Sequence, residues 1–292
     1  MTKKKNVTEA FDSIQALKGN DEFKQMVQRL NFFLHNKAVH GLPEISLPSY
    51  LLSIAKGGGI TNLANTFANF LHATGAIEFC GNEKMLEFSL RYKEPELYFS
   101  ELTRLNNKLT EAAGYNHKFK GLVCVNIEQW HGHEYEPHFS LFLDYVAENK
   151  DILAVFYTHK TDEKALKGME AAISLRLRIE PLALRFPNAA ELTEYVEAKH
   201  FNSKGFSLAD DARATLQRIV GRLVAGAHFG GFKSIDRLAQ DILYSVLSQG
   251  TIDSKLVSNE ILAAFDKDTT DIDRINTLAS TKKIIGFTEE RG

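Results

Sequence analysis

Hydrophobic residues follow two different spacings along the first part of the chain, and each spacing predicts one kind of element. Short runs of apolar, often β-branched residues indicate buried strands. These runs lie at residues 50–55, 85–90, 121–128, 152–158 and 182–186. Apolar residues three and four positions apart indicate amphipathic helices, and they occur at residues 21–34, 63–74, 98–113 and 139–146. Strands that alternate with helices predict an α/β sandwich with a mostly parallel sheet.

Beyond residue 189 the strand pattern disappears. Helical spacing predicts a small all-α subdomain with helices at residues 191–199, 207–224 and 234–247. Short helices are also expected in the tail at 259–265 and 271–278, and one near the N-terminus at 10–17. The chain therefore divides into a polar N-terminal arm (1–19), an α/β subdomain (20–188), an α-helical subdomain (189–248) and a tail (249–292).

The composition narrows the class to which the protein can belong. The chain has 292 residues, of which 44% are hydrophobic and 25% charged, as in an ordinary globular protein. Its 35 basic and 37 acidic residues nearly cancel, so the overall charge indicates neither a nucleic acid nor a membrane partner. No apolar run reaches the length of a membrane span, no secretory signal follows Met1, and Cys80 and Cys124 have no paired spacing. We therefore expect a cytoplasmic protein.

A glycine-rich loop joins the strand at 50–55 to the following helix, with the residues Lys56, Gly57, Gly58, Gly59, Ile60 and Thr61. A strand, a glycine turn and a helix form a phosphate-binding loop, because backbone N–H groups point inward and the helix N-terminus adds partial positive charge. The full pattern G-x-x-x-x-G-K-[ST], however, needs a lysine where this chain has Ile60. Losing a hydrogen bond to a charged group costs about 1.5–3 kcal/mol, or roughly ten- to a hundredfold in affinity. Two interpretations stay open: residual nucleotide binding, or glycines retained only for close packing.

Short motifs in the rest of the chain carry a family resemblance. In chain order they are Leu17-Lys-Gly-Asn-Asp-Glu-Phe-Lys24, Gly41-Leu-Pro43, Ala73-Thr-Gly75, Arg178, Phe186-Pro-Asn-Ala-Ala-Glu-Leu192, Gly205-Phe-Ser-Leu-Ala-Asp-Asp-Ala212 and Gly230-Gly-Phe-Lys233. Over residues 14–248 the chain resembles an AAA+ module, in particular the family that contains red-type rubisco activase and the stage V sporulation ATPase. The resemblance implies an AAA+ P-loop sandwich with a mostly parallel sheet and a small all-α lid. It also implies ATP or ADP with Mg²⁺ as cofactor, a protein partner and a homo-oligomeric ring.

The resemblance places a nucleotide at the glycine loop. Lys56, the three glycines, Thr61 and Asn62 would contact the nucleotide, and the Thr61 hydroxyl would hold Mg²⁺. Thr158, which ends its strand, fits the polar residue that senses the terminal phosphate. Lys233 replaces the lid arginine, which keeps a positive charge but loses the bidentate guanidinium fork.

The end of the strand at 121–128 is the second part of the implied site. A working AAA+ protein has an aspartate there for Mg²⁺ and a neighbouring glutamate that polarises the attacking water. Here Asn126 and Ile127 stand in these places or, one residue later, Ile127 and Glu128. In the first alignment neither residue is a carboxylate at its usual place, and in the second only Glu128 is, so at least one of the two carboxylates is missing. Glu128 is then the candidate catalytic residue, and strand alternation predicts that it shares a face with Asn126.

Two further features complete the candidate residues. Arg178, with Arg176 as the alternative, is the arginine that the resemblance implies is offered to a neighbouring subunit. A loop after Trp130 gathers imidazole and carboxylate groups, at His131, His133, Glu134, Glu136 and His138. Such groups suit divalent metals, but their spacing matches no fixed metal motif, and we expect a polar loop. In the family this loop lies near the central pore, where a partner would be contacted.

Three functions are compatible with these residues. The first is an AAA+ protein with a degenerate ATP site that acts through nucleotide-sensitive assembly or partner binding, with weak or no hydrolysis. Ile60, the lost carboxylate and Lys233 all weaken the same catalytic apparatus, which favours this hypothesis. The second is an active ATPase that remodels a protein partner, with Lys56 and Glu128 compensating. The third is a structural scaffold that binds no nucleotide.

Overall fold

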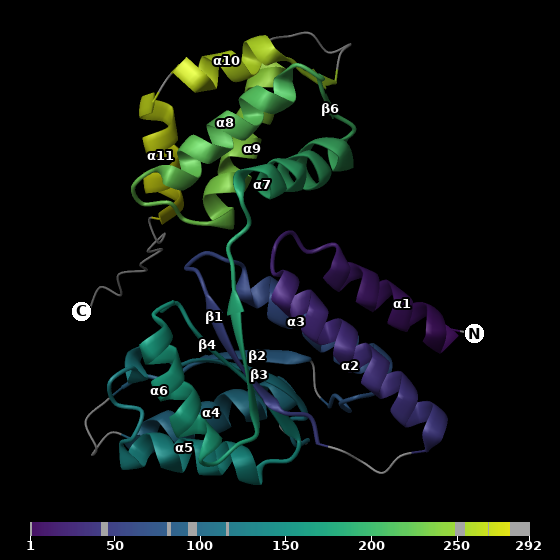
Figure 1. Ribbon diagram of the computed structural model, residues 1–292, viewed down its shortest axis with the longest axis vertical. Helices are drawn as coiled ribbons and strands as arrows, with labels where there is room; N and C mark the ends of the chain where they lie inside the picture. Colours follow the sequence, from purple (N-terminus) through teal and green to yellow (C-terminus); the bar gives the residue numbers. More distant parts are fainter. Residues whose placement is uncertain are drawn as a thin grey trace, which may run out of the picture. The chain divides into compact units, whose positions relative to one another are not determined.

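The computed structural model describes residues 2–41, 46–80, 83–92, 98–114, 117–248, 255–267 and 269–280. The chain forms two compact units (Figure 1). One holds Met1–Ala55 and Gly59–Phe186, and the other holds Lys56–Gly58 and Pro187–Gly292. The predicted turn at Leu42-Pro43 and parts of the predicted tail (249–254, 268 and 281–292) lie outside the described residues.

A five-stranded parallel sheet forms the middle of the first unit. Its strands are β1 (Ser49–Ile54), β2 (Met85–Ser89), β3 (Gly121–Asn126), β4 (Ile152–Thr158) and β5 (Ile179–Leu184). Their order in the sheet is β2-β3-β4-β1-β5, and every neighbouring pair is parallel. The α/β fold with a parallel sheet is therefore confirmed. Because the strands are parallel, their carboxyl ends share one edge of the sheet, where loops collect functional side chains.

Helices cover both faces of this sheet (Figure 1). They are α1 (Thr2–Gln15), α2 (Asp21–His40), α3 (Ile60–Thr74), α4 (Tyr98–Ala113), α5 (Pro137–Glu148) and α6 (Glu163–Ser174). Successive residues of β1 point to opposite faces: Tyr50 packs in the cluster that contains Phe67 of α3, and Leu51 packs in the cluster that contains Phe142 of α5. The sheet is thus the middle layer of a three-layer sandwich.

The first unit departs from the prediction at three places. The short helix predicted at 10–17 within a polar arm begins already at Thr2 as α1, which buries Ile14 and sets the Phe11 ring 6.3 Å from the Phe70 ring of α3. The helix α6 was not predicted, although it buries Met169 and Ile173, four positions apart, and the Asp162 side chain caps it by accepting from the Ala165 N–H. The strand β3 ends at Asn126, and a 3₁₀ turn then begins at Glu128, which limits the predicted strand.

The second unit is mainly helical. Its elements after Pro187 are α7 (Ala189–Val196), a π-helical turn (Glu197–Phe201), a 3₁₀ turn (Asn202–Lys204), β6 (Ser207–Leu208), α8 (Ala212–Ala225), α9 (Phe232–Ser248), β7 (Leu256–Val257), α10 (Asn259–Lys267) and α11 (Thr269–Ser280). The predicted helix at 207–224 starts only at Ala212, because β6 pairs in parallel with β7 from far along the chain. A capping box between Asn188 and Glu191 starts α7. None of the described helices has the length and apolar character of a bilayer-spanning helix.

We expect Phe67→Ala to destabilise the first unit by about 3–5 kcal/mol, the usual cost of truncating a buried aromatic side chain. Phe67 is 1% exposed, and its ring meets the Phe23 and Tyr50 rings edge-on at 5.4 and 5.5 Å. Urea unfolding followed by far-UV circular dichroism measures the loss. Phe32→Ala is the matched control, because Phe32 is 69% exposed. Equal effects of the two substitutions would contradict this assignment of the core.

Candidate functional site

The glycine loop has the backbone that its sequence predicts. Gly57 and Gly59 adopt left-handed conformations, with φ of 78° and 80°, which glycine reaches without steric cost. Gly59 is the N-cap of α3, and its carbonyl oxygen accepts from the Leu63 N–H at 3.0 Å. The first N–H groups of a helix have no partner within the helix, and the first turn of α3 contains no acidic residue. The start of α3 therefore offers N–H groups and partial positive charge to an anion.

Ile60 stands at the lysine position and serves the core. Its side chain is partly buried and packs against the cluster between α3 and the sheet. The neighbouring Thr61 and Asn62 are exposed on the first turn of α3, and Lys56 is exposed at the start of the loop. An apolar side chain thus packs at the foot of the helix, where the phosphate-binding pattern has a charged group.

A carboxylate that the sequence analysis missed lies beside Thr61. The Thr61 hydroxyl donates to Glu87 Oε2 at 2.8 Å, and the Tyr157 hydroxyl donates to Glu87 Oε1 at 2.8 Å. Burial and the neighbouring Glu87 raise the pKa of Tyr157, so this hydroxyl stays protonated and remains a donor. Glu87 is the one charged residue of the alternating strand Met85–Ser89, a signal that could have identified it.

Glu128 lies at the end of β3 and is held by two donors from the end of β4. Its Oε2 accepts from the Thr158 hydroxyl and from the His159 N–H, both at 2.7 Å. Burial alone would raise the pKa of Glu128, but these hydrogen bonds outweigh it and lower the pKa, so the carboxylate is ionised at neutral pH. The structure therefore brings the predicted residues Glu128 and Thr158 into direct contact.

Asn126 and Glu128 meet in a different way from the one predicted. Strand alternation was expected to place them on one face, but the strand ends at Asn126. The backbone turns at Ile127, whose side chain is fully buried, and the Glu128 N–H donates to Asn126 Oδ1 at 2.8 Å. The Asn126 side chain therefore holds the backbone where the turn that carries Glu128 begins. Ile127 is occupied with core packing and offers no polar group.

One histidine of the polar loop joins this site. His131 Nε2 lies 2.7 Å from Thr158 Oγ1. Because the single hydroxyl proton of Thr158 goes to Glu128, we assign the Nε2 proton to His131 as the donor. Burial, followed by the nearby Lys160, lowers the pKa of His131, so the ring is neutral at pH 7. The rest of the loop is held by its own contacts: the His133 ring stacks on Tyr92 with 3.9 Å between ring centres.

The described residues contain no group of three or more histidine, cysteine, aspartate or glutamate side chains that could hold a metal ion. Within the loop, His133 Nδ1 lies 2.7 Å from Glu136 Oε1, and the Gly132 N–H donates to Glu134 Oε2 at 2.5 Å. Imidazole and carboxylate thus pair within the loop itself.

The two candidate arginines lie at the other edge of the sheet. Arg178 is exposed and immediately precedes β5, and Arg176 forms an ion pair with Asp144 at 2.8 Å. The amino end of β5 is opposite the edge where β1, β3 and β4 lead into the loops, since all neighbouring strands are parallel. Neither arginine can therefore serve the site at the carboxyl edge of its own sheet.

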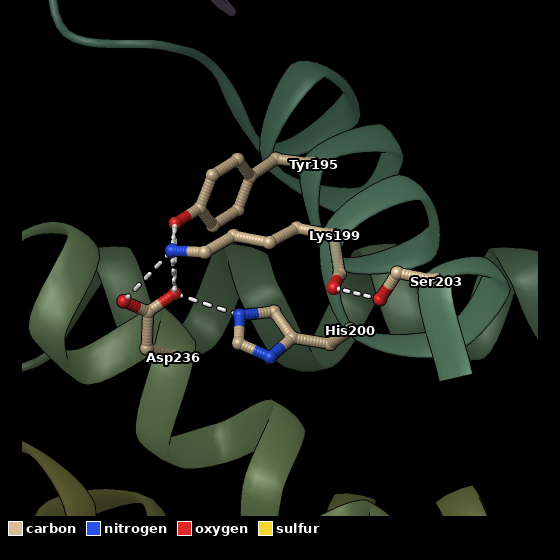
Figure 2. Close-up of polar contacts among 5 residues, drawn as sticks. All are labelled: Tyr195, Lys199, His200, Ser203 and Asp236. Atoms are coloured by element: carbon tan, nitrogen blue, oxygen red, sulfur yellow. Dashed lines mark hydrogen bonds and ion pairs between the residues drawn. The ribbon is translucent and has the colours of Figure 1, made fainter.

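In the second unit, Lys233 is exposed on the first turn of α9, close in sequence to a polar cluster (Figure 2). Asp236 of α9 accepts from the Tyr195 hydroxyl at 2.8 Å, from His200 Nε2 at 2.7 Å and from Lys199 Nζ at 3.2 Å. The π-helical turn brings residues five positions apart onto one face, which places His200 beside Tyr195. These bonds join the α7 segment to α9.

No family model and no curated protein matches the sequence. Solved structures do match. RuvB, the Holliday junction branch migration motor of Thermotoga maritima, matches with a TM-score of 0.50 and 15% identity over 86% of this chain and 72% of that one. The AAA domain of FIGL-1 gives 0.48 and 14% over 90% and 87%, and domain III of the Thermotoga maritima replication initiation protein DnaA gives 0.45 and 12% over 90% and 96%.

At such identities a structural match concerns the fold alone. The strand order and the match to RuvB confirm the predicted AAA+ fold with a helical region after the sheet. The narrower resemblance to the family of red-type rubisco activase and the stage V sporulation ATPase has no support among these structures.

We expect Asp236→Asn to change how stability depends on pH. Burial opposes ionisation of Asp236, but the bonds from His200, Tyr195 and Lys199 lower its pKa in the folded protein. A depressed folded pKa contributes stability above the unfolded value of about 3.9, and this stability is lost as the pH falls through the folded pKa. The asparagine variant should therefore lose less stability than the wild type between about pH 5 and pH 3.

Urea midpoints across this pH range measure the effect. Asp241→Asn is the matched control on the same helix, because among the residues that the structure describes the Asp241 carboxylate makes only a 4.0 Å ion pair with Arg237. Parallel pH profiles of the wild type and Asp236→Asn would contradict the prediction.

Proposed function

We propose that this protein binds ATP or ADP with Mg²⁺ at the carboxyl edge of its sheet, and that the nucleotide controls its assembly or its binding to a protein partner. Hydrolysis is weak or absent. Bound nucleotide supplies free energy through its different affinities for different conformations or assemblies.

The loop itself is the observation that carries the proposal. Its left-handed glycines and the acid-free start of α3 keep the backbone donors of a phosphate-binding loop, while Ile60 turns toward the core. The residues present fit a magnesium nucleotide, since backbone N–H groups suit phosphate oxygens and the Thr61 hydroxyl suits Mg²⁺. Because these N–H groups act without the lysine of the full pattern, we expect a lower affinity for nucleotide than in a complete phosphate-binding loop.

Slow hydrolysis is supported by the state of Glu128. To polarise a water, a carboxylate needs a free oxygen aimed at that water. The bonds that Glu128 Oε2 accepts from Thr158 and His159 hold the carboxylate against the end of β4, and Ile60 stands where the phosphate-binding pattern has the lysine that stabilises developing charge. Nucleotide would then persist at the site long enough to act as a structural ligand.

Assembly is supported by the position of Arg178. It is exposed at the edge opposite the loops of its own sheet, so any contact with a nucleotide would be to that of a second copy. Light scattering coupled to size exclusion, with and without ATP and Mg²⁺, measures whether nucleotide changes the oligomeric state.

An active ATPase is the second candidate, and the place of the Glu128 carboxylate directly after β3, beside Thr158 at the end of β4, is the observation that favours it. The carboxylate is ionised at neutral pH, as a residue that polarises water must be. In this alternative Glu128 leaves Thr158 when nucleotide binds.

Restoring the lysine tests the proposal. We expect Ile60→Lys to raise the affinity for ATP with Mg²⁺ by roughly ten- to a hundredfold, which corresponds to one hydrogen bond to a charged group. Isothermal titration calorimetry measures the affinity, and Ile60→Met controls for the change of shape at this position. Equal affinities of the lysine and methionine variants would show that Ile60 is not the weakness, and no binding by any variant would exclude a nucleotide function.

Glu128→Gln separates the two candidate functions. Under our proposal phosphate release from ATP is at background in the wild type, and the substitution leaves it there. Turnover in the wild type that falls by about 10²-fold or more in the variant would instead favour the active ATPase, the usual effect of losing a positioned general base. A colorimetric phosphate assay measures the rate, and Glu163→Gln, at an exposed ion pair with Lys167, is the control.

A further inference from the structure

Glu87 of β2 connects the first turn of α3 to the end of β4. Its two oxygens receive one hydrogen bond each, from the Thr61 hydroxyl and the Tyr157 hydroxyl, both at 2.8 Å. Thr61 lies on the exposed first turn of α3, directly after the glycine loop. The half-buried carboxylate therefore lies next to the hydroxyl that is placed to meet a phosphate-bound cation.

The strand register explains how a residue of β2 reaches this place. Glu87 pairs with Cys124 of β3, and Tyr157 of β4 pairs with Asn126 of β3. The hydrogen bond between Glu87 and Tyr157 thus crosses over the end of β3. The Glu87 carboxylate lies above the strand whose own last residue, Asn126, is neutral.

We infer that Glu87 supplies the acidic ligand to nucleotide-bound Mg²⁺ that Asn126 cannot supply, acting directly or through a bound water. This inference rests on the proposed function. Mg²⁺ takes oxygen ligands and is bound through one or two carboxylates together with phosphates and waters. A carboxylate from the adjacent strand meets this requirement although the carboxylate at the end of β3 is lost.

The direction of the Thr61 hydrogen bond is compatible with this role. The hydroxyl gives its proton to Glu87, which leaves its oxygen lone pairs available to a cation. Thr61 can therefore keep its bond to Glu87 while it ligates Mg²⁺. The other explanation is that Glu87 only anchors the first turn of α3, and it predicts no dependence of nucleotide binding on the charge of Glu87.

The test measures how strongly Mg²⁺ improves nucleotide binding. Isothermal titration gives the Kd for ADP with Mg²⁺ and with EDTA, for the wild type and for Glu87→Gln. Glutamine has the same size and still accepts from Thr61, but it has no charge. We expect Mg²⁺ to tighten ADP binding in the wild type by at least about tenfold, and the substitution to reduce this ratio by about tenfold, or 1.4 kcal/mol. The affinity in EDTA should stay equal or rise, because a negative charge near the phosphates is removed.

Electron paramagnetic resonance of Mn²⁺ in the presence of ADP is a second measurement that does not depend on calorimetry. The fraction of Mn²⁺ bound to the protein should fall in Glu87→Gln. Glu180→Gln, an acid of β5 paired with Arg29 at 2.8 Å, is the matched control and should keep the wild-type ratio. Glu87→Ala is a second variant, which removes the carboxylate but keeps the Thr61 hydroxyl, and it should lower the ratio as Glu87→Gln does. It provides the same test if Glu87→Gln does not fold.

The outcomes separate this inference from the proposed function. ADP binding with an unchanged Mg²⁺ ratio in Glu87→Gln would overturn the inference and leave the proposed function standing. No nucleotide binding by the wild type in either condition would overturn both. A reduced ratio in Glu87→Gln and Glu87→Ala, with Glu180→Gln unchanged, supports the assignment of Glu87.

Discussion

The packing of α3 against β1 is the interaction on which the candidate site depends. The Phe67 ring sits between Phe23 and Tyr50, and this burial fixes the helix along the sheet. With the helix fixed, Gly59 must end the loop in a left-handed conformation, and the first turn of α3 lies at the carboxyl edge. Thr61 can then reach Glu87 on a strand that is not adjacent to β1. Loss of this packing would separate these groups without any change in their chemistry.

A second set of contacts ties the strand ends to one another at the same edge. His159 Nδ1 donates to the Ile54 carbonyl oxygen at 2.9 Å, and the Ser53 hydroxyl donates to the Lys160 carbonyl oxygen at 2.7 Å. These bonds hold the end of β4 against the end of β1, where the glycine loop starts. Because Thr158 and His159 also donate to Glu128, the position of that carboxylate depends on the junction of three strands. Hydrogen bonds therefore hold the ends of β1, β3 and β4 together at this edge, although Ile60 and Asn126 there carry no charge.

The sequence predicted the parts of this structure that follow from local pattern. The sheet strands, α4 and the glycine stop at Gly75 depend on periodicity and on backbone freedom, both of which a short window contains. The misses depend on partners far along the chain. The strand β6 exists only because residues 256–257 pair with it, and α1 starts at Thr2, before the helix predicted at 10–17, although its buried face contains little more than Ile14 and its neighbours.

The candidate site shows the same division. Thr158 and the glycines were identified because motifs place them, whereas Glu87 and His131 act through contacts 26 and 27 residues away in sequence. Glu87 did leave a signal as a carboxylate in an apolar strand, but its partner Thr61 could be identified only from the fold. The Asn126–Glu128 relation was misjudged because alternation was extended past the point where the strand ends and Ile127 turns into the core.

The charges at the carboxyl edge of the sheet determine how this site would hold a phosphate group. A phosphate-binding loop with its lysine neutralises much of the phosphate charge by itself, and a cation adds to that. Here Ile60 adds none, and two carboxylates, Glu87 and Glu128, lie at the same edge of the sheet. Without a cation these carboxylates oppose an anionic ligand by ordinary Coulomb repulsion. With Mg²⁺ between them and the phosphates, the same charges become attractive. Under the proposed function, a site of this kind would depend on its cation more than a site with the lysine does, because Mg²⁺ would supply the positive charge that Ile60 does not.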